Sequence, residues 1–226
     1  MINKFQQKII NIDLKDKNSL LKNIDLIANL LNENKVLVLP TKTIYGISAR
    51  FDNAKNFERI YEIKKRSQDM PFIILISSLG DLGNLVLNLP KNAQKLIEDF
   101  WEKDEAIPLT IIFKKNPKLA GFITGNKETI GVRRAEFDFI RKIIDKSAPL
   151  ISTSATISGV KSAPLEITDI PQSILNDVDA IIKYPEKLLG IESTIVDFSK
   201  DEECPSLVRQ GAVPYKYILQ KLGIKI

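Results

Sequence analysis

The stretch that decides the fold is Lys35-Val36-Leu37-Val38-Leu39-Pro40-Thr41-Lys42-Thr43-Ile44-Tyr45-Gly46. Its first five residues are a continuous apolar run, which is typical of a central strand buried on both faces of a sheet. Pro40 should end this strand, because proline has no N–H to donate to the ladder. Hydroxyl and cationic side chains therefore follow the carboxyl end of a buried strand, which is where open α/β sheets bind their ligands.

Outward from this stretch, helices and strands alternate along the chain. Helical spacing of apolar residues predicts helices at 18–33, 54–65, 91–102 and 136–147, with an amphipathic tail after Pro214. Apolar runs predict strands at 35–39, 70–76, 108–113, 129–133, 150–151, 180–182, 193–196 and 206–209. Because several strands follow one another without a helix between them, we expect an α/β fold with a mixed parallel and antiparallel open sheet and flanking helices. Residues 159–178 read as a loop that could act as a movable lid.

Length and composition predict one domain in a soluble protein. The 226 residues, of which 44% are hydrophobic and 27% charged, can build one substantial core. We expect a catalytic domain at 1–213 and a short helical tail at 214–226. The chain has no apolar run near the ~18 residues of a membrane span. It has no secretion signal at its N-terminus and one cysteine, Cys204, so a cytoplasmic location is expected.

The chain contains no histidine. This excludes Ser-His-Asp and Cys-His catalysis and histidine-based zinc sites, and one cysteine cannot form a thiolate cluster. Chemistry must then come from lysine, arginine, carboxylates, hydroxyls and backbone dipoles. The net charge of +5 would favour anions such as nucleotides or RNA, although a generally lysine-rich composition explains the same excess.

Three further clusters combine cations or hydroxyls. Lys64-Lys65-Arg66 closes a predicted helix, where cations complement the helix dipole; the outer two could instead bind one polyphosphate if the helix unwinds there. The run Ser152–Gly159 is too polar to continue a strand, and is either a cap or turn or a phosphate cradle before a helix. The third cluster, Glu192–Asp197, accompanies a predicted strand.

The remaining candidate residues can also be interpreted either as ordinary structural features or as parts of a binding site. Thr41 and Thr43 either form an ordinary turn or hydrogen-bond a zwitterionic ligand such as an amino acid, with Tyr45 as a flat wall. Arg133 and Arg209 add two cationic side chains, which suit a phosphate or carboxylate ligand. Residues 121–127 superficially suggest a P-loop but fail its glycine spacing and lack its Lys-Ser/Thr pair.

Taken together, these motifs resemble the YrdC-like family of threonylcarbamoyl-adenylate synthases over about residues 15–213. The family's Pro-Thr-(Glu/Asp)-Thr-x-Tyr-Gly-Leu element is similar to Pro40–Ile47, and its Lys-x-Arg element to Lys64 and Arg66. Its Ser-Thr-Ser-Ala-Asn-x-Ser-Gly block resembles Ser152–Gly159. The other similar elements are Val132-Arg133, residues 192–197 and Arg209–Gly211.

The resemblance implies a YrdC-like twisted sheet with a concave basic cleft. It implies condensation of L-threonine, bicarbonate and ATP to threonylcarbamoyl-adenylate and pyrophosphate, for the t6A37 modification of tRNA. Mg²⁺ is expected with ATP, held by phosphate oxygens and water without a protein ligand cage. The implied partners are these substrates, with tRNA and the downstream threonylcarbamoyl transferase as further ones, and no membrane.

The resemblance also assigns residues to roles. Lys64 and Arg66 are the expected catalytic residues. Threonine would be bound by Thr41, Thr43 and Tyr45. Besides Lys64 and Arg66, the expected nucleotide-binding residues are Thr110, Arg133, Ser152, Ser154, Thr156, Ser193 and Arg209. No residue is assigned to a metal, and no general base is identified.

The chain departs from the family pattern at three informative positions. Thr156 stands where the family has Asn, Lys42 where it has an acid, and Glu192 where it has Pro. Three other functions stay open. The net positive charge and the concave basic face that the resemblance implies would suit an RNA-binding protein of the same fold, related domains of hydrogenase-maturation proteins suggest carbamoyl transfer, and a paralogue with an altered substrate would explain Thr156. The second C-terminal domain of longer members is not expected here.

Overall fold

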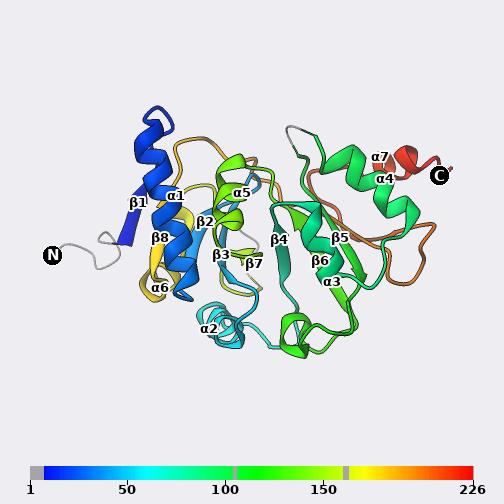
Figure 1. Cartoon of the computed structure of the whole chain (residues 1–226), viewed down its shortest axis with the longest axis horizontal. Helices are drawn as coiled ribbons and strands as arrows, with labels where there is room; N and C mark the ends of the chain where they lie inside the picture. Colours follow the sequence, from blue (N-terminus) through cyan, green and yellow to red (C-terminus); the bar gives the residue numbers. More distant parts are fainter. Residues whose placement is uncertain (1–7, 104–105, 160–162, 226) are drawn as a thin grey trace.

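The computed structural model describes residues 8–103, 106–159 and 163–225, whose strands form one ten-stranded sheet (Figure 1). The strand order is β1-β8-β2-β3-β7-β4-β6-β5-β9-β10. The strands are β1 (Ile9–Asn11), β2 (Leu37–Pro40), β3 (Tyr45–Arg50), β4 (Ile73–Ile76), β5 (Leu109–Lys114), β6 (Thr129–Arg134), β7 (Leu150–Ser154), β8 (Ala180–Lys183), β9 (Thr194–Asp197) and β10 (Ser206–Arg209).

The sheet mixes parallel and antiparallel pairs, as the sequence predicted. Strands β2, β3, β7 and β4 are joined antiparallel in the middle of the sheet. Parallel pairs β1–β8, β2–β8, β4–β6 and β5–β9 lie on either side of this group. Strand β1 and the C-terminal helix lie at opposite ends of the molecule's long axis (Figure 1). The expected mixed open α/β sheet with flanking helices is confirmed.

The helices pack in pairs around the sheet, α1 with α5, α2 with α6 and α4 with α7. Helix α1 begins at the Asp16 cap, whose side chain accepts hydrogen bonds from two backbone amides. Its Ile24, Ile27 and Leu31 recur at helical spacing and are buried in the core. The helices are α1 (Lys17–Asn32), α2 (Ala54–Lys64), α3 (Leu82–Leu85), α4 (Lys91–Phe100), α5 (Asp138–Asp145), α6 (Gln172–Asp177) and α7 (Tyr215–Leu222).

Strand β3 is the main element that the sequence pattern did not predict. The Thr-Lys-Thr segment is the turn of a hairpin, and the chain pairs back on β2 from Tyr45 onward. Gly46 and Ser48 interrupt the hydrophobic pattern, but both are buried because β7 lies on the other side of β3. The Ser48 hydroxyl donates to Ser152 Oγ at 3.1 Å, so its polarity is satisfied inside the sheet.

Two loop predictions were wrong. Strand β7 continues through Ser154, although the Ser/Thr run looked too polar for a strand, because pairing with β3 satisfies its backbone. No helix follows directly, since the described residues 155–159 and 163–166 form turns and loop. The expected loop at 159–178 contains α6. The lid stays a prediction, and residues 160–162 lie outside the described part.

The C-terminal tail forms the expected helix, α7, and packs against α4. Ile218 of α7 is fully buried and belongs to the hydrophobic core. The division of the chain at residue 213 stays a prediction. Among the described residues, no helix combines the length and the apolar character needed to cross a lipid bilayer.

Candidate active site

Residues from seven segments of the described chain line one cavity of about 220 Å³. The segments are the β2–β3 turn, the stretch after α2, and strands β4, β6, β7 and β9 with the end of β10. Eight of the predicted site residues line it: Thr41, Thr43, Arg66, Arg133, Ser152, Ser154, Ser193 and Arg209. The sheet thus brings together motifs that are up to 168 residues apart, as the sequence analysis expected for a single ligand site.

The β2–β3 turn is held together by its own hydroxyl groups. Thr41 Oγ1 donates to the carbonyl oxygen of Ile44 at 2.6 Å and lies 2.8 Å from Thr43 Oγ1. Gly46 follows the turn on β3, and a Cβ there would lie 3.0 Å from Ser152 Oγ and 3.1 Å from the Thr153 carbonyl oxygen. Glycine therefore lets the turn and the β7 hydroxyls approach each other at the cavity.

Tyr45 does not line the cavity, contrary to its expected role as a wall for threonine. Its side chain is buried behind the hairpin, and its hydroxyl oxygen accepts a hydrogen bond from the Tyr184 backbone N–H at 3.1 Å. Burial raises the pKa of the Tyr45 phenol. The alternation of side chains along a strand explains the placement, because Ile44 and Gly46 face the cavity and Tyr45 faces the core.

The helix carrying Lys64 does unwind where the polyphosphate reading required it. Helix α2 ends at Lys64, and Lys65 takes a left-handed conformation with φ of 51°. The Arg66 backbone N–H then donates to the Tyr61 carbonyl oxygen at 2.9 Å. This turn separates the two cations, since Arg66 lines the cavity and Lys64 does not.

Lys64 is buried and holds the turn that follows β7. Its Nζ donates to the carbonyl oxygens of Ser154 and Thr156, the latter at 2.7 Å. Its own carbonyl oxygen accepts the Ser158 N–H at 3.1 Å. Burial, with the nearby Arg66 charge, lowers the Lys64 pKa to about 7. Lys64 therefore supports the site from behind the cavity surface in this structure, and its catalytic role stays a prediction.

Arg66 lines the cavity and carries one buried donor that has no partner among the described residues. Its Nη1 donates to Thr153 Oγ1 at 3.1 Å and its Nη2 to the Pro71 carbonyl oxygen at 2.9 Å. The guanidinium lies over the Phe72 ring, 5.1 Å from the centroid. Arg66 Nε is buried and has no hydrogen-bond partner among the described residues. An orphaned buried donor is costly, so a ligand oxygen here would be stabilised.

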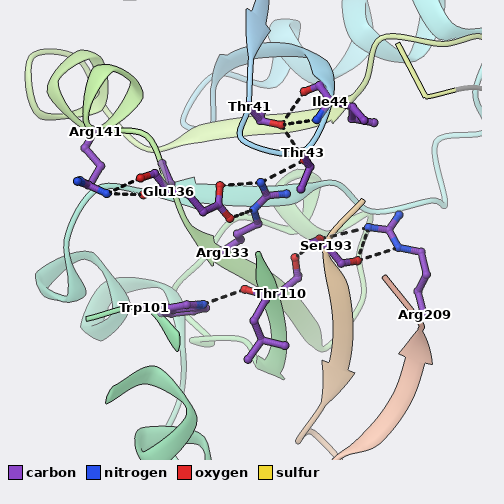
Figure 2. A network of polar contacts seen from close by, with 12 residues as sticks. Thr41, Thr43, Ile44, Trp101, Thr110, Arg133, Glu136, Arg141, Ser193 and Arg209 are labelled. Carbon is purple, nitrogen blue, oxygen red and sulfur yellow. Dashed lines mark hydrogen bonds and ion pairs between the residues drawn. The ribbon is translucent and has the colours of Figure 1, made fainter. Parts of the chain in front are cut away.

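Arg133 is fixed by a buried carboxylate (Figure 2). Its Nε and Nη2 donate to the two oxygens of Glu136 at 2.6 and 2.7 Å, and Nη2 also donates to Thr43 Oγ1 at 3.3 Å. Glu136 is a supporting residue that the sequence analysis missed. Glu136 lies three residues after Arg133, a spacing that predicts an ion pair on a helix, but residues 133–136 are not helical, so the spacing did not indicate this pair.

Arg209 and Ser193 form a second polar network, also drawn in Figure 2. Arg209 Nη1 donates to Glu192 Oε2 at 2.8 Å, and Nη2 to the Ser193 carbonyl oxygen at 2.9 Å. Ser193 Oγ lies 2.8 Å from Thr110 Oγ1. Thr110 is fully buried behind Ser193 and does not line the cavity, so it supports Ser193 instead of facing a ligand.

Thr156 likewise lies behind the cavity surface. Its Oγ1 is 2.9 Å from Ser154 Oγ, and the residue is buried. The shorter side chain at the family's Asn position therefore orients the Ser154 hydroxyl, which does line the cavity. Four of the twelve predicted site residues thus do not line the cavity: Lys64, Tyr45, Thr110 and Thr156. Of these, Lys64 and Thr156 contact the lining residue Ser154, and Thr110 contacts the lining residue Ser193.

The cavity has a net cationic character. Three guanidinium groups line it, from Arg66, Arg133 and Arg209. Glu136 and Glu192 pair with the latter two, whereas no carboxylate lies within ion-pair distance of Arg66 among the described residues. Burial lowers the pKa values of Arg66 and Arg209, which shows that their charges are partly desolvated. Desolvated cations flanked by hydroxyl donors are suited to phosphate and carboxylate groups.

The structure thus combines an open mixed α/β sheet with a cationic, hydroxyl-lined cavity whose chemistry suits anionic groups. A family model named for Sua5, YciO and YrdC and described as "Telomere recombination" matches residues 29–211. The chain belongs to this family, and the resemblance inferred from its motifs is confirmed.

Individual relatives agree with this membership. The chain is 32% identical over 201 residues to a threonylcarbamoyl-AMP synthase of Pyrococcus abyssi, covering 88% of this chain and 57% of that protein. A Bacillus subtilis protein of the same name is 30% identical, with 87% and 55% covered. The structure of P. abyssi Sua5 complexed with L-threonine superposes with a TM-score of 0.84 at 31% identity, covering 95% of this chain and 61% of the other. The chain thus spans little more than half the length of these relatives.

Proposed function

We propose that this chain is a threonylcarbamoyl-AMP synthase that condenses L-threonine, bicarbonate and ATP. The observation that carries the proposal is the convergence of Arg66, Arg133 and Arg209 on one hydroxyl-lined cavity. The name of the P. abyssi relative and the threonine in its structure support the choice of substrates. A cavity of this kind suits a reaction whose reactants carry a triphosphate and two carboxyl-type groups.

The proposed division of the cavity follows its two polar networks. Thr41 and Thr43, on the β2–β3 turn, bind threonine. Arg133, which the resemblance assigned to the nucleotide, is placed at this threonine end instead, because its Nη2 donates to Thr43 Oγ1 at 3.3 Å. Arg66, just after α2, and Arg209, at the end of β10, bind the phosphates, and Ser154 and Ser193 add hydroxyl contacts to the adenylate. Arg66 Nε is the donor that gains its missing partner when a phosphate or carbamate oxygen is bound.

In the proposed reaction, the threonine nitrogen bonds to the carbon of bicarbonate with loss of water and a proton. A carbamate oxygen then bonds to the α-phosphorus of ATP as the bond to pyrophosphate breaks. The chain's contribution is to hold these groups together and to stabilise the charge that develops on phosphate oxygens. Among the described residues that line the cavity, Glu192 is the carboxylate, and it is paired with Arg209. Mg²⁺ would therefore be held mainly by the phosphate oxygens of ATP and by water.

We further propose that the protein is cytoplasmic and that it supplies its product to a downstream transferase. The product is a mixed anhydride that a downstream transferase would consume to modify adenosine in tRNA. Direct contact with tRNA or with that transferase belongs to this proposal as well.

The test is product analysis with the purified chain. Mass spectrometry and pyrophosphate release should detect threonylcarbamoyl-adenylate only when ATP, threonine and bicarbonate are all present. The matched control replaces threonine and bicarbonate by carbamoyl phosphate, which should yield no adenylate. Pyrophosphate release that ignores threonine, or that requires carbamoyl phosphate, would refute the proposal and favour a carbamoyl transferase.

A further inference from the structure

We propose that Glu136 is a positioning residue of the synthase, which sets the affinity for threonine through Arg133 and Thr43. This inference rests on the function proposed above. Glu136 itself does not line the cavity. In the described part of the chain, the hydrogen bonds of its carboxylate go to Arg133, which does line the cavity, so we infer that its effect on substrate passes through the Arg133 guanidinium.

Two hydrogen bonds to Glu136 fix the orientation of the Arg133 guanidinium. Both Glu136 oxygens accept from Arg133, at 2.6 and 2.7 Å, and the exposed fractions of the two side chains are 7% for Arg133 and 2% for Glu136. A bidentate, desolvated pair of this kind has one well-defined orientation. It directs the Arg133 Nη2 group at Thr43 Oγ1, 3.3 Å away (Figure 2).

The segment carrying Glu136 is itself held in place. Arg141 Nη1 donates to the Glu136 carbonyl oxygen at 2.8 Å, and the Ala135 N–H donates to the Ile76 carbonyl oxygen at 2.9 Å. Lys42 Nζ lies 5.4 Å from the centre of the Phe137 ring, which joins the same segment to the β2–β3 turn. The carboxylate therefore has a rigid base from which to orient Arg133.

The effect should be confined to one end of the cavity. Thr43 and Thr41 are 2.8 Å apart through their hydroxyls, and both are assigned to threonine. The cations assigned to the phosphates have separate supports, Thr153 and Pro71 for Arg66 and Ser193 and Glu192 for Arg209. Loss of the Glu136 charge should then weaken threonine binding and leave the affinity for ATP unchanged.

The experiment measures the KM for threonine and for ATP separately in Glu136→Gln. We expect the KM for threonine to rise about tenfold, the range of a lost charge-assisted hydrogen bond, with the KM for ATP within about twofold of wild type. The matched control is Asp138→Asn, which removes a carboxylate of the same region that pairs with Arg141 but is 65% exposed. This control should keep both KM values.

A second variant separates positioning from general support of the fold. In an Arg133→Met background, adding Glu136→Gln should have no further effect on the KM for threonine, because Glu136 acts through Arg133. This double variant also removes both buried charges, so it stays informative if Glu136→Gln alone does not fold. Additive effects of the two substitutions, or equal rises in both KM values, would overturn the inference.

The outcomes also distinguish this inference from the proposed function. If wild-type protein forms no threonylcarbamoyl-adenylate, both fail together. If wild type is active and Glu136→Gln keeps the wild-type KM for threonine, only the role of Glu136 is refuted.

Discussion

Lys64 Nζ donates a hydrogen bond to the carbonyl oxygen of Thr156 at 2.7 Å, across 92 residues of sequence. The same nitrogen contacts the Ser154 carbonyl oxygen, so one buried side chain ties the end of α2 to the turn after β7. Burial nevertheless opposes its charge and lowers the Lys64 pKa to about 7. The carbonyl contacts favour the ammonium form, and the burial disfavours it, which makes this lysine sensitive to pH.

We predict that Lys64 makes stability depend on pH between about 7 and 10.5, the folded and ordinary pKa values. In this window the unfolded chain holds a proton on Lys64 that the folded chain has lost, so the free energy of unfolding rises with pH. The rise is at most about 1.4 kcal/mol per pH unit. Urea unfolding of wild type and Lys64→Met should therefore diverge in favour of wild type as pH rises from 7 to 10.

The control for this prediction is Lys55→Met, which removes an exposed lysine from the other end of α2. Its difference from wild type should stay constant over the same pH range. A constant difference for Lys64→Met as well would show that Lys64 has the same pKa in the folded and unfolded chain.

We predict that Thr156→Val destabilises the protein and disorients Ser154. Valine keeps the volume but removes the hydroxyl that lies 2.9 Å from Ser154 Oγ, and one lost hydrogen bond costs about 1 kcal/mol. Thr156→Ser, which keeps the hydroxyl, should retain wild-type stability more closely. Urea unfolding and the KM for ATP measure the two effects. A Thr156→Val protein with the stability and the KM for ATP of Thr156→Ser would show that the hydroxyl contact to Ser154 does not contribute.

Much of the fold follows from periodicity alone. The run at Val36–Leu39 is buried on both faces, and the apolar spacing of α1 is that of a packed helix, so both were predictable. Strand β3 was not, because its pattern contains Gly46 and Ser48, which only the neighbouring strand β7 explains. Such strands form because they pair with strands distant in sequence, and the local hydrophobic pattern does not reveal that pairing.

The sequence predicted the residues that line the cavity better than the residues that contact one another behind it. Arg66, Arg133 and Arg209 line the cavity as expected, since clustered cations and hydroxyls indicate anion binding. Tyr45 lies outside the cavity lining because one residue along a strand reverses the direction of a side chain. Glu136 was missed because a buried acid shows its partner only after the fold brings the two side chains together.

We predict that Arg66→Lys lowers pyrophosphate release strongly without unfolding the protein. Lysine cannot reproduce the guanidinium that donates to Thr153 and Pro71 and carries a further, unpartnered donor at Nε, which we assign to the ligand. The loss of a charged hydrogen bond to ligand corresponds to about 10- to 100-fold in kcat/KM. Arg59→Lys, at a partly exposed position on α2, is the control and should keep activity. Unchanged kcat/KM in Arg66→Lys would remove Arg66 Nε from ligand binding.

We predict that Gly211→Ala displaces the Glu192–Ser193 backbone and so weakens both stability and nucleotide binding. A Cβ at Gly211 would lie 2.3 Å from the Glu192 carbonyl oxygen and 2.5 Å from that of Ser193, closer than any contact that backbone can accommodate without moving. Overpacking of this kind costs about 1–3 kcal/mol, and the shift would also carry Ser193 away from Arg209 and Thr110. The control is Gly83→Ala in α3, where a Cβ meets nothing within 4 Å and alanine should stabilise the helix by up to about 1 kcal/mol. Urea unfolding and calorimetric ATP binding check both variants, and a Gly211→Ala protein with the urea midpoint and ATP affinity of wild type would show that this backbone contact does not hold Ser193 in place.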